Sequence, residues 1–84
     1  MAETIHNFFK FMDKVLVKEL PCKRAQGQAL GQCERFLYDL KEQLTLDEMM
    51  YCVGALQRRI HLRYGMELPK LGRRILKAMN FVEE

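Results

Sequence analysis

Residues 45–65, TLDEMMYCVGALQRRIHLRYG, contain the start, the apolar stripe and the end of one helix. Thr45 and Glu48 have the T-x-x-E spacing of a capping box, in which each side chain accepts a hydrogen bond from the other residue's backbone N–H. Gly65 suits the left-handed conformation that ends many helices. Between these signals, apolar residues recur at three- and four-residue steps, which predicts a core-facing helix over 46–64. They are Leu46, Met49, Met50, Val53, Leu56, Ile60 and Tyr64.

Two helices are expected before this one, over 5–20 and 28–44. Thr4 can cap the first, and Pro21 is expected to end it because proline cannot continue the helical hydrogen-bond ladder. The polar stretch 22–27 then predicts a turn that connects the two helices.

A last helix is expected over 69–81, with Pro69 at the first helical position, where its missing N–H does no harm. Gly72 falls on the apolar side of this helix, where the absent side chain permits close approach of another helix. The chain is therefore expected to be all-α, a compact bundle of four helices in a single domain over 1–84. The expected core, to which Phe8 also belongs, is Ile5, Phe9, Met12, Leu16, Leu30, Cys33, Leu37, Leu40, Met49, Val53, Leu56, Ile60, Leu71, Ile75 and Met79.

Composition indicates an ordinary globular protein, since 49% of the 84 residues are hydrophobic and 30% are charged. Cys22, Cys33 and Cys52 are odd in number and lack CxxC spacing, which favours a reducing compartment over a disulfide framework. Charged residues, among them Lys10, Asp13, Lys14 and Lys18, interrupt 5–20, so this segment predicts neither a signal peptide nor a membrane span. We expect a cytoplasmic protein.

Positive charge is concentrated toward the C-terminus. Residues 57–84 hold seven basic and three acidic side chains, a net charge of +4, whereas 1–56 have a net charge of −1. Local basicity of this kind favours an acidic or anionic partner. The seven basic residues are Arg58, Arg59, Arg63, Lys70, Arg73, Arg74 and Lys77.

Four of these cations share one side of the expected helix over 69–81. At 100° per residue, Lys70, Arg73, Arg74 and Lys77 fall within an arc of roughly 100° opposite the apolar side. Such a face can bind phosphates or the carboxylates of a protein partner. It can equally be a solvated face that binds nothing.

The other three, Arg58, Arg59 and Arg63, lie on the helix over 46–64, away from its apolar stripe. They either extend the basic surface or pair with acidic side chains of neighbouring helices, and the sequence does not decide between the two. The candidate acidic partners are Asp39, Glu42, Asp47 and Glu48.

Apolar residues also occur outside the core-facing stripes. Phe11 and Val17 on the first helix, and Tyr51 and Leu62 on the third, are expected to be exposed contact residues. A surplus of this kind marks a surface for another protein or for a second copy of the chain.

The sequence gives little support for metal binding or for catalysis. His6, His61 and the cysteines do not have the spacing of a zinc site. Paired carboxylates, a phosphate-binding glycine loop and a nucleophile motif are missing from the sequence. We expect no metal, no cofactor and no enzymatic activity.

Two functions remain. The favoured one is a small protein-interaction module, a regulator or inhibitor, that docks on a larger protein with an acidic patch. The alternative is a nucleic-acid-binding (DNA-binding) regulator with the helix over 69–81 on phosphates. A sequence pI of about 8.9 is borderline for the second function. A homodimer is compatible with both.

Overall fold

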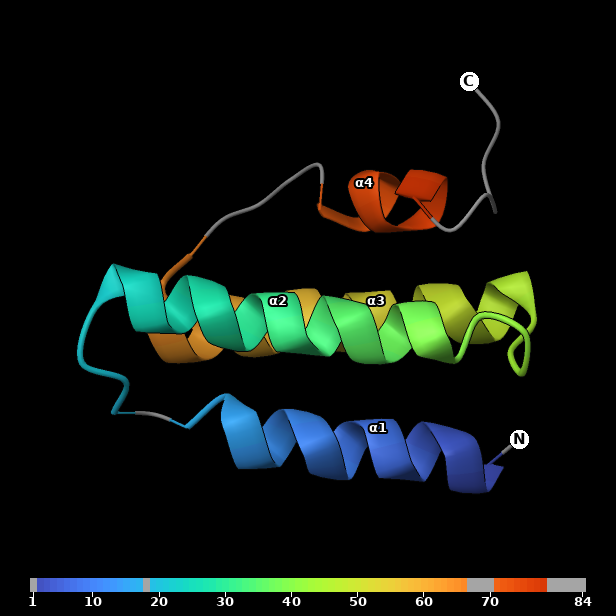
Figure 1. Ribbon diagram of the computed structural model, residues 1–84, viewed down its shortest axis with the longest axis horizontal. Helices are drawn as coiled ribbons and strands as arrows, with labels where there is room; N and C mark the ends of the chain where they lie inside the picture. The colour runs from blue at the N-terminus through green and yellow to red at the C-terminus, as the bar shows by residue number, and fades with distance from the viewer. Residues whose placement is uncertain (1, 18, 67–70, 79–84) are drawn as a thin grey trace.

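The computed structural model describes residues 2–17, 19–66 and 71–78, and it confirms the all-α bundle (Figure 1). Its helices are α1 (Ala2–Val15), α2 (Lys23–Asp39), α3 (Leu46–Tyr64) and α4 (Leu71–Ala78).

The helices are arranged around the pair formed by α2 and α3 (Figure 1). Helices α1 and α2 run antiparallel, as do α2 and α3, whereas α1 and α3 are parallel. Helix α3 contacts the other three helices, and α1 and α4 lie on opposite sides of the α2–α3 pair. In this central position α3 buries Met49, Cys52, Val53, Leu56 and Ile60.

Helix α3 begins and ends where the sequence predicts. The Thr45 side chain accepts from the Glu48 N–H at 3.1 Å, and the Glu48 carboxylate accepts from the Thr45 N–H at 2.8 Å. Gly65 adopts φ 63° and donates its N–H to the carbonyl of His61 at 2.9 Å. Both signals are local, so no distant contact is needed to set them.

Helix α1 differs from the prediction at both ends. It begins at Ala2, so Thr4 lies inside the helix and does not cap it, and it ends at Val15, well before Pro21. The Leu16 N–H still bonds to the Met12 carbonyl at 2.8 Å, after which the chain leaves the helix. Side chains of α3 take over the carbonyls at this end, as described below.

Helix α2 is displaced toward the N-terminus relative to the prediction. It starts at Lys23, so most of the expected 22–27 turn is helical, and it ends at Asp39 instead of 44. Lys, Arg, Ala and Gln are good helix formers, and they outweigh the single Gly27 in this stretch. Leu44 lies beyond the helix but is still buried in the core.

The core matches most of the expected residues. Ile5, Phe9 and Leu40 are only partly buried and pack against it. Met50 was predicted on the core-facing stripe but is 52% exposed, because one residue beyond the buried Met49 turns the helix by about 100° toward solvent. Leu46, predicted on the same stripe, is 41% exposed. The buried residues are Phe8, Met12, Leu16, Ala29, Leu30, Cys33, Leu37, Leu44, Met49, Cys52, Val53, Leu56, Ile60 and Ile75.

Helix α4 is short but closely packed. Ile75 is buried, and a Cβ at Gly72 would lie only 3.2 Å from the Val53 Cγ1 of α3. The predicted close approach at Gly72 is therefore confirmed. The expectations for Pro69, Lys70 and Met79, and for the side chain of Leu71, fall outside the part of the chain that the structure describes.

Candidate interaction surfaces

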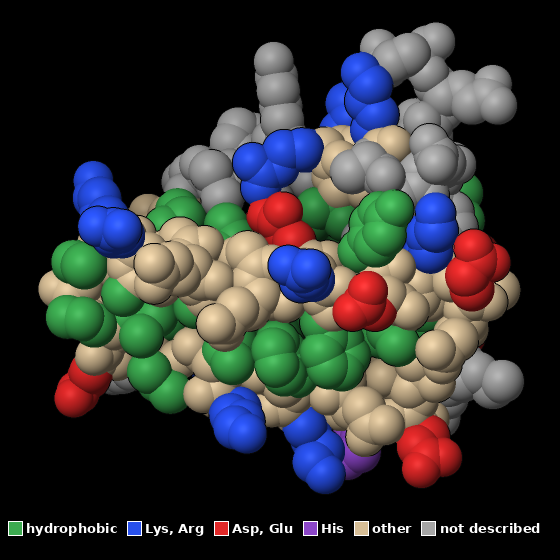
Figure 2. All heavy atoms as spheres, viewed as in Figure 1, with side chains coloured by type: hydrophobic (Ala, Val, Ile, Leu, Met, Phe, Trp, Pro, Cys, Tyr) green, Lys and Arg blue, Asp and Glu red, His purple; other side chains and the backbone are tan. Residues whose placement is uncertain are grey.

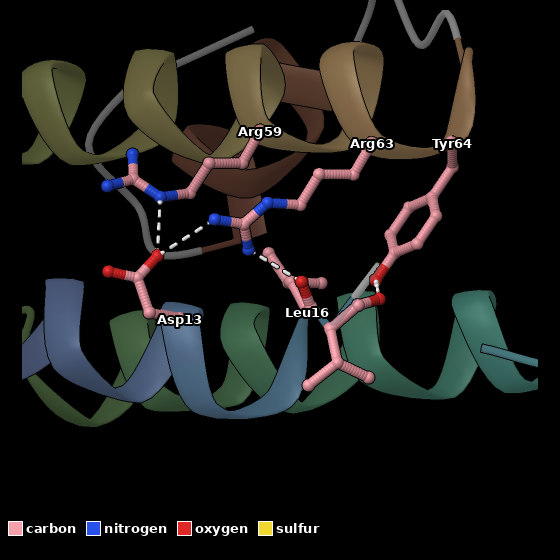
Figure 3. A network of polar contacts seen from close by, with 6 residues as sticks. Asp13, Leu16, Arg59, Arg63 and Tyr64 are labelled. Atoms are coloured by element: carbon pink, nitrogen blue, oxygen red, sulfur yellow. Dashed lines mark hydrogen bonds and ion pairs between the residues drawn. The ribbon is translucent and has the colours of Figure 1, made fainter. Parts of the chain in front are cut away.

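Two of the predicted binding cations join α3 to α1 (Figure 3). Arg59 Nε donates to Asp13 Oδ1 at 3.2 Å, and Arg63 Nη2 donates to the same oxygen at 3.2 Å. The hydrogen bond from Arg59 is the main cause that lowers the pKa of Asp13 below its usual value. The acidic partner is thus on α1, not among the residues that the sequence suggested, because α1 lies alongside α3.

The same end of α3 satisfies the carbonyls that follow α1. Arg63 Nη1 donates to the Leu16 carbonyl at 2.6 Å, and the Tyr64 hydroxyl donates to the Val17 carbonyl at 2.6 Å (Figure 3). The last carbonyls of a helix lack partners within it, and donors placed there stabilise its end. Asp13, Arg59, Arg63 and Tyr64 form what we call the α1–α3 latch.

The cations of α4 are placed differently. Arg74 forms an ion pair with Glu34 of α2 and remains 60% exposed, so the pair sits at the surface. Arg73 and Lys77 are exposed. They leave α4 with a basic outer surface on a helix whose other side is fixed to the core.

A groove runs between α2 and α4, with a volume of about 700 Å³. We call it the α2–α4 groove. Figure 2 shows basic and acidic side chains gathered around this boundary. Arg35 and Tyr38 were not singled out from the sequence, although both lie outside the apolar stripe of the second predicted helix. The groove is lined by Gly31, Glu34, Arg35, Tyr38, Asp39, Arg74 and Ile75.

Arg58 lies apart from this groove. It is exposed on α3, and in the described part of the chain it has no ion-pair partner. Among the residues that the structure describes, the predicted cations therefore fall in three locations: the α1–α3 latch, helix α4, and the exposed side of α3.

The predicted apolar contact residues differ in their exposure. Val17, Tyr51 and Leu62 are exposed, with Leu62 at 73% and Tyr51 at 61%. Phe11 was expected to be exposed but is half-buried, because its ring packs on Phe36 of α2 with centroids 4.6 Å apart. Figure 2 shows an apolar band where α1 meets α2.

Two of the thiols are poorly suited to chemistry. Cys33 and Cys52 are fully buried, and burial raises their pKa values to about 12 and about 11. A thiol held in this protonated state is a weak nucleophile and a poor metal ligand at neutral pH. Within residues 2–17, 19–66 and 71–78, no three His, Cys, Asp or Glu residues come together in a way that could hold a metal ion.

Comparison with models of known protein families, with curated proteins and with solved structures gave no match. Among the described residues, none of the helices has the length and apolar character needed to cross a membrane.

Proposed function

We propose that this chain is a small, non-enzymatic interaction module that docks on a larger protein through the α2–α4 groove and the cations of α4. The observation that carries the proposal is the groove itself, which combines apolar and charged walls. Ile75 is buried at the groove, Tyr38 is about half exposed, and Arg35 is exposed beside them. Grooves of this kind accept a segment with one or two apolar anchors.

Charge indicates what the segment carries. The groove lining includes Arg35 and Arg74 against Glu34 and Asp39, and Glu34 is already paired with Arg74. The exposed cations of α4, Arg73 and Lys77, add two positive charges to this side of the molecule. An acidic, partly apolar segment of a partner protein fits this combination best.

A protein partner is favoured over nucleic acid because several cations have internal partners. Arg59 and Arg63 bind Asp13, and Arg74 binds Glu34. Binding of a phosphate backbone depends on the number of cations that can neutralise it. Fewer of the predicted cations are therefore available for phosphates than the sequence suggests.

Affinity capture from a native lysate, followed by nuclease treatment, tests the proposal. We expect the chain to retain a specific protein after nuclease, and a variant with Arg73→Glu and Lys77→Glu to lose it. A variant with Lys10→Glu and Lys14→Glu is the matched control, since it makes the same charge change on the exposed side of α1. Circular dichroism checks that all three chains are folded.

Two results contradict the proposal. Loss of every captured protein after nuclease would favour the nucleic-acid-binding alternative. Equal capture by the α4 variant and the control variant would show that the partner binds elsewhere.

A further inference from the structure

A second surface lies on α3, turned away from the core. We call it the exposed α3 face, and it is separate from the α2–α4 groove. Its two large apolar side chains are Met50, 52% exposed, and Tyr51, 61% exposed. A helix that shows such side chains on one stripe commonly packs against another helix. The face consists of Asp47, Met50, Tyr51, Gly54, Ala55 and Arg58.

Small residues create a recess in the middle of this face. Gly54 and Ala55 lie within a hollow of about 330 Å³ beside Phe9 of α1. A Cβ at Gly54 would meet no other atom within 4 Å. Glycine inside a helix is destabilising relative to alanine, and packing within this chain offers no compensation for it. The recess is roughly ten times the volume that one water molecule occupies, about 30 Å³, so it has room for a large side chain.

Arg58 lines the recess, and the oppositely charged Asp47 lies on the same face nearer the start of α3. Asp47 and Arg58 are eleven residues apart, which is close to three helical turns and about 16 Å along α3. They share one stripe of the helix but are too far apart to pair within the chain. In the described residues neither has an ion-pair partner.

We propose that the exposed α3 face binds a second copy of this chain, with the two α3 helices antiparallel about a two-fold axis that passes between Cys52 and Val53. In this register Asp47 of each copy lies opposite Arg58 of the other. Tyr51 lies opposite Gly54, so the aromatic side chain of one copy meets the recess of the other. A two-fold contact makes each of these pairs twice.

The side-chain sizes and the charges of the exposed α3 face both favour a second copy of this chain over an unrelated helix. The single register that aligns Asp47 with Arg58 also aligns Met50 with Ala55 and Tyr51 with Gly54. An acidic helix of another protein could pair with Arg58, but its negative charge would also lie near Asp47 and be repelled by it. The exposed α3 face is thus complementary to itself, with unlike charges and with large residues opposite small ones.

Sedimentation velocity of the purified chain over a range of concentrations tests the contact. We expect the mass to rise from 10.0 kDa toward twice that value. Arg58→Asp alone and Asp47→Arg alone should each raise the dissociation constant at least about tenfold, because each brings like charges together twice. An equimolar mixture of these two variants should restore the dimer, since every charge pair is then unlike again. Lys10→Asp and Glu3→Arg are matched controls on α1 that should leave the mass unchanged.

Gly54→Gln provides a variant with unchanged charge and a filled recess. It should abolish the dimer while raising the melting temperature of the monomer, because Gln is a better helix former than Gly. Gly27→Gln should raise the melting temperature without affecting the dimer, since Gly27 is also exposed with open space around it.

Three results overturn the proposal: a parent chain that stays at 10.0 kDa up to about 1 mM, a dimer that withstands both charge reversals, or a mixture of the two variants that remains monomeric. The experiment uses the purified chain alone, so the absence of a dimer would not bear on the proposal that a larger protein binds the α2–α4 groove.

Discussion

The cations of α3 and those of α4 are alike in sequence but differ in what surrounds them. Arg59 and Arg63 reach across to α1, where Asp13 and the Leu16 carbonyl accept their hydrogen bonds. Arg73 and Lys77 are exposed on a short helix at the other side of the bundle. A cluster of basic residues in a sequence therefore contains groups in two different surroundings, and only the neighbouring helices distinguish them.

The difference has a simple physical origin. A helix that ends without a capping residue leaves carbonyls unpaired, and a guanidinium can bind both such a carbonyl and a nearby carboxylate. Arg63 does both, with Leu16 and Asp13. On α4, Arg74 instead forms an ion pair with Glu34 of α2 at the surface of the molecule.

Among single substitutions, the largest expected effect comes from Arg63→Met. The substitution removes the bond to the Leu16 carbonyl and one of the two bonds to Asp13. We expect a loss of about 2 kcal/mol in the free energy of unfolding, as is usual for a hydrogen bond from a charged group. Urea denaturation measures it, with Lys10→Met on the exposed side of α1 as the control. Equal stability of the two variants would contradict the role of the α1–α3 latch.

A smaller effect is expected from pH acting on Asp13. Its pKa is lowered in the folded chain, mainly by the hydrogen bond from Arg59, so the latch contributes stability above the unfolded value of about 4. This contribution is lost as the pH falls through the lower folded value. Because the Asp13 side chain is 55% exposed, we expect less than about 1 kcal/mol.

The comparison between the parent and Asp13→Asn checks this effect. Urea denaturation from pH 6 to about 3 should show that the difference in unfolding free energy between the two chains shrinks as the pH falls. A difference that stays constant over this range would mean that the Asp13 charge does not stabilise the fold.

The sequence predicted the local features of the fold well. Thr45, Glu48 and Gly65 set the ends of α3 through contacts within a few residues, and the structure reproduces them. Gly72 was placed correctly against a neighbouring helix because it falls on the apolar side of its own helix. Short-range periodicity and capping were sufficient at these positions, whereas the Thr4 cap and the turn over 22–27, inferred from similar local signals, were wrong.

The end of α1 and the latch were not predictable in the same way. Their determinants, Arg63 and Tyr64, bond to residues 47 positions away in the chain, so the contacts require that α1 and α3 lie side by side. The sequence suggested acidic partners on or near the second and third helices, whereas the actual one is Asp13.

The candidate interaction surfaces show the same contrast between features set by local sequence and features set by contacts between helices. Exposure of Tyr51 and Leu62 followed from their position opposite the apolar stripe of α3, and the structure agrees. The α2–α4 groove could not be foreseen, because it depends on how α4 packs beside Arg35 and Tyr38. The exposure predicted for Phe11 was wrong for a similar reason, since Phe36, on which its ring packs, belongs to another helix.

Paired charge reversals, measured by urea denaturation, test most directly whether the cations of the α1–α3 latch stabilise the fold more than the exposed cations of α4 do. Replacing Arg59 and Arg63 together by Glu removes three hydrogen bonds and brings two carboxylates to Asp13, so we expect a loss of at least about 3 kcal/mol. Replacing Arg73 and Lys77 together by Glu should cost less than about 1 kcal/mol, because both side chains are exposed and the contacts of exposed charges contribute little to stability. Equal losses from the two double variants would contradict this difference.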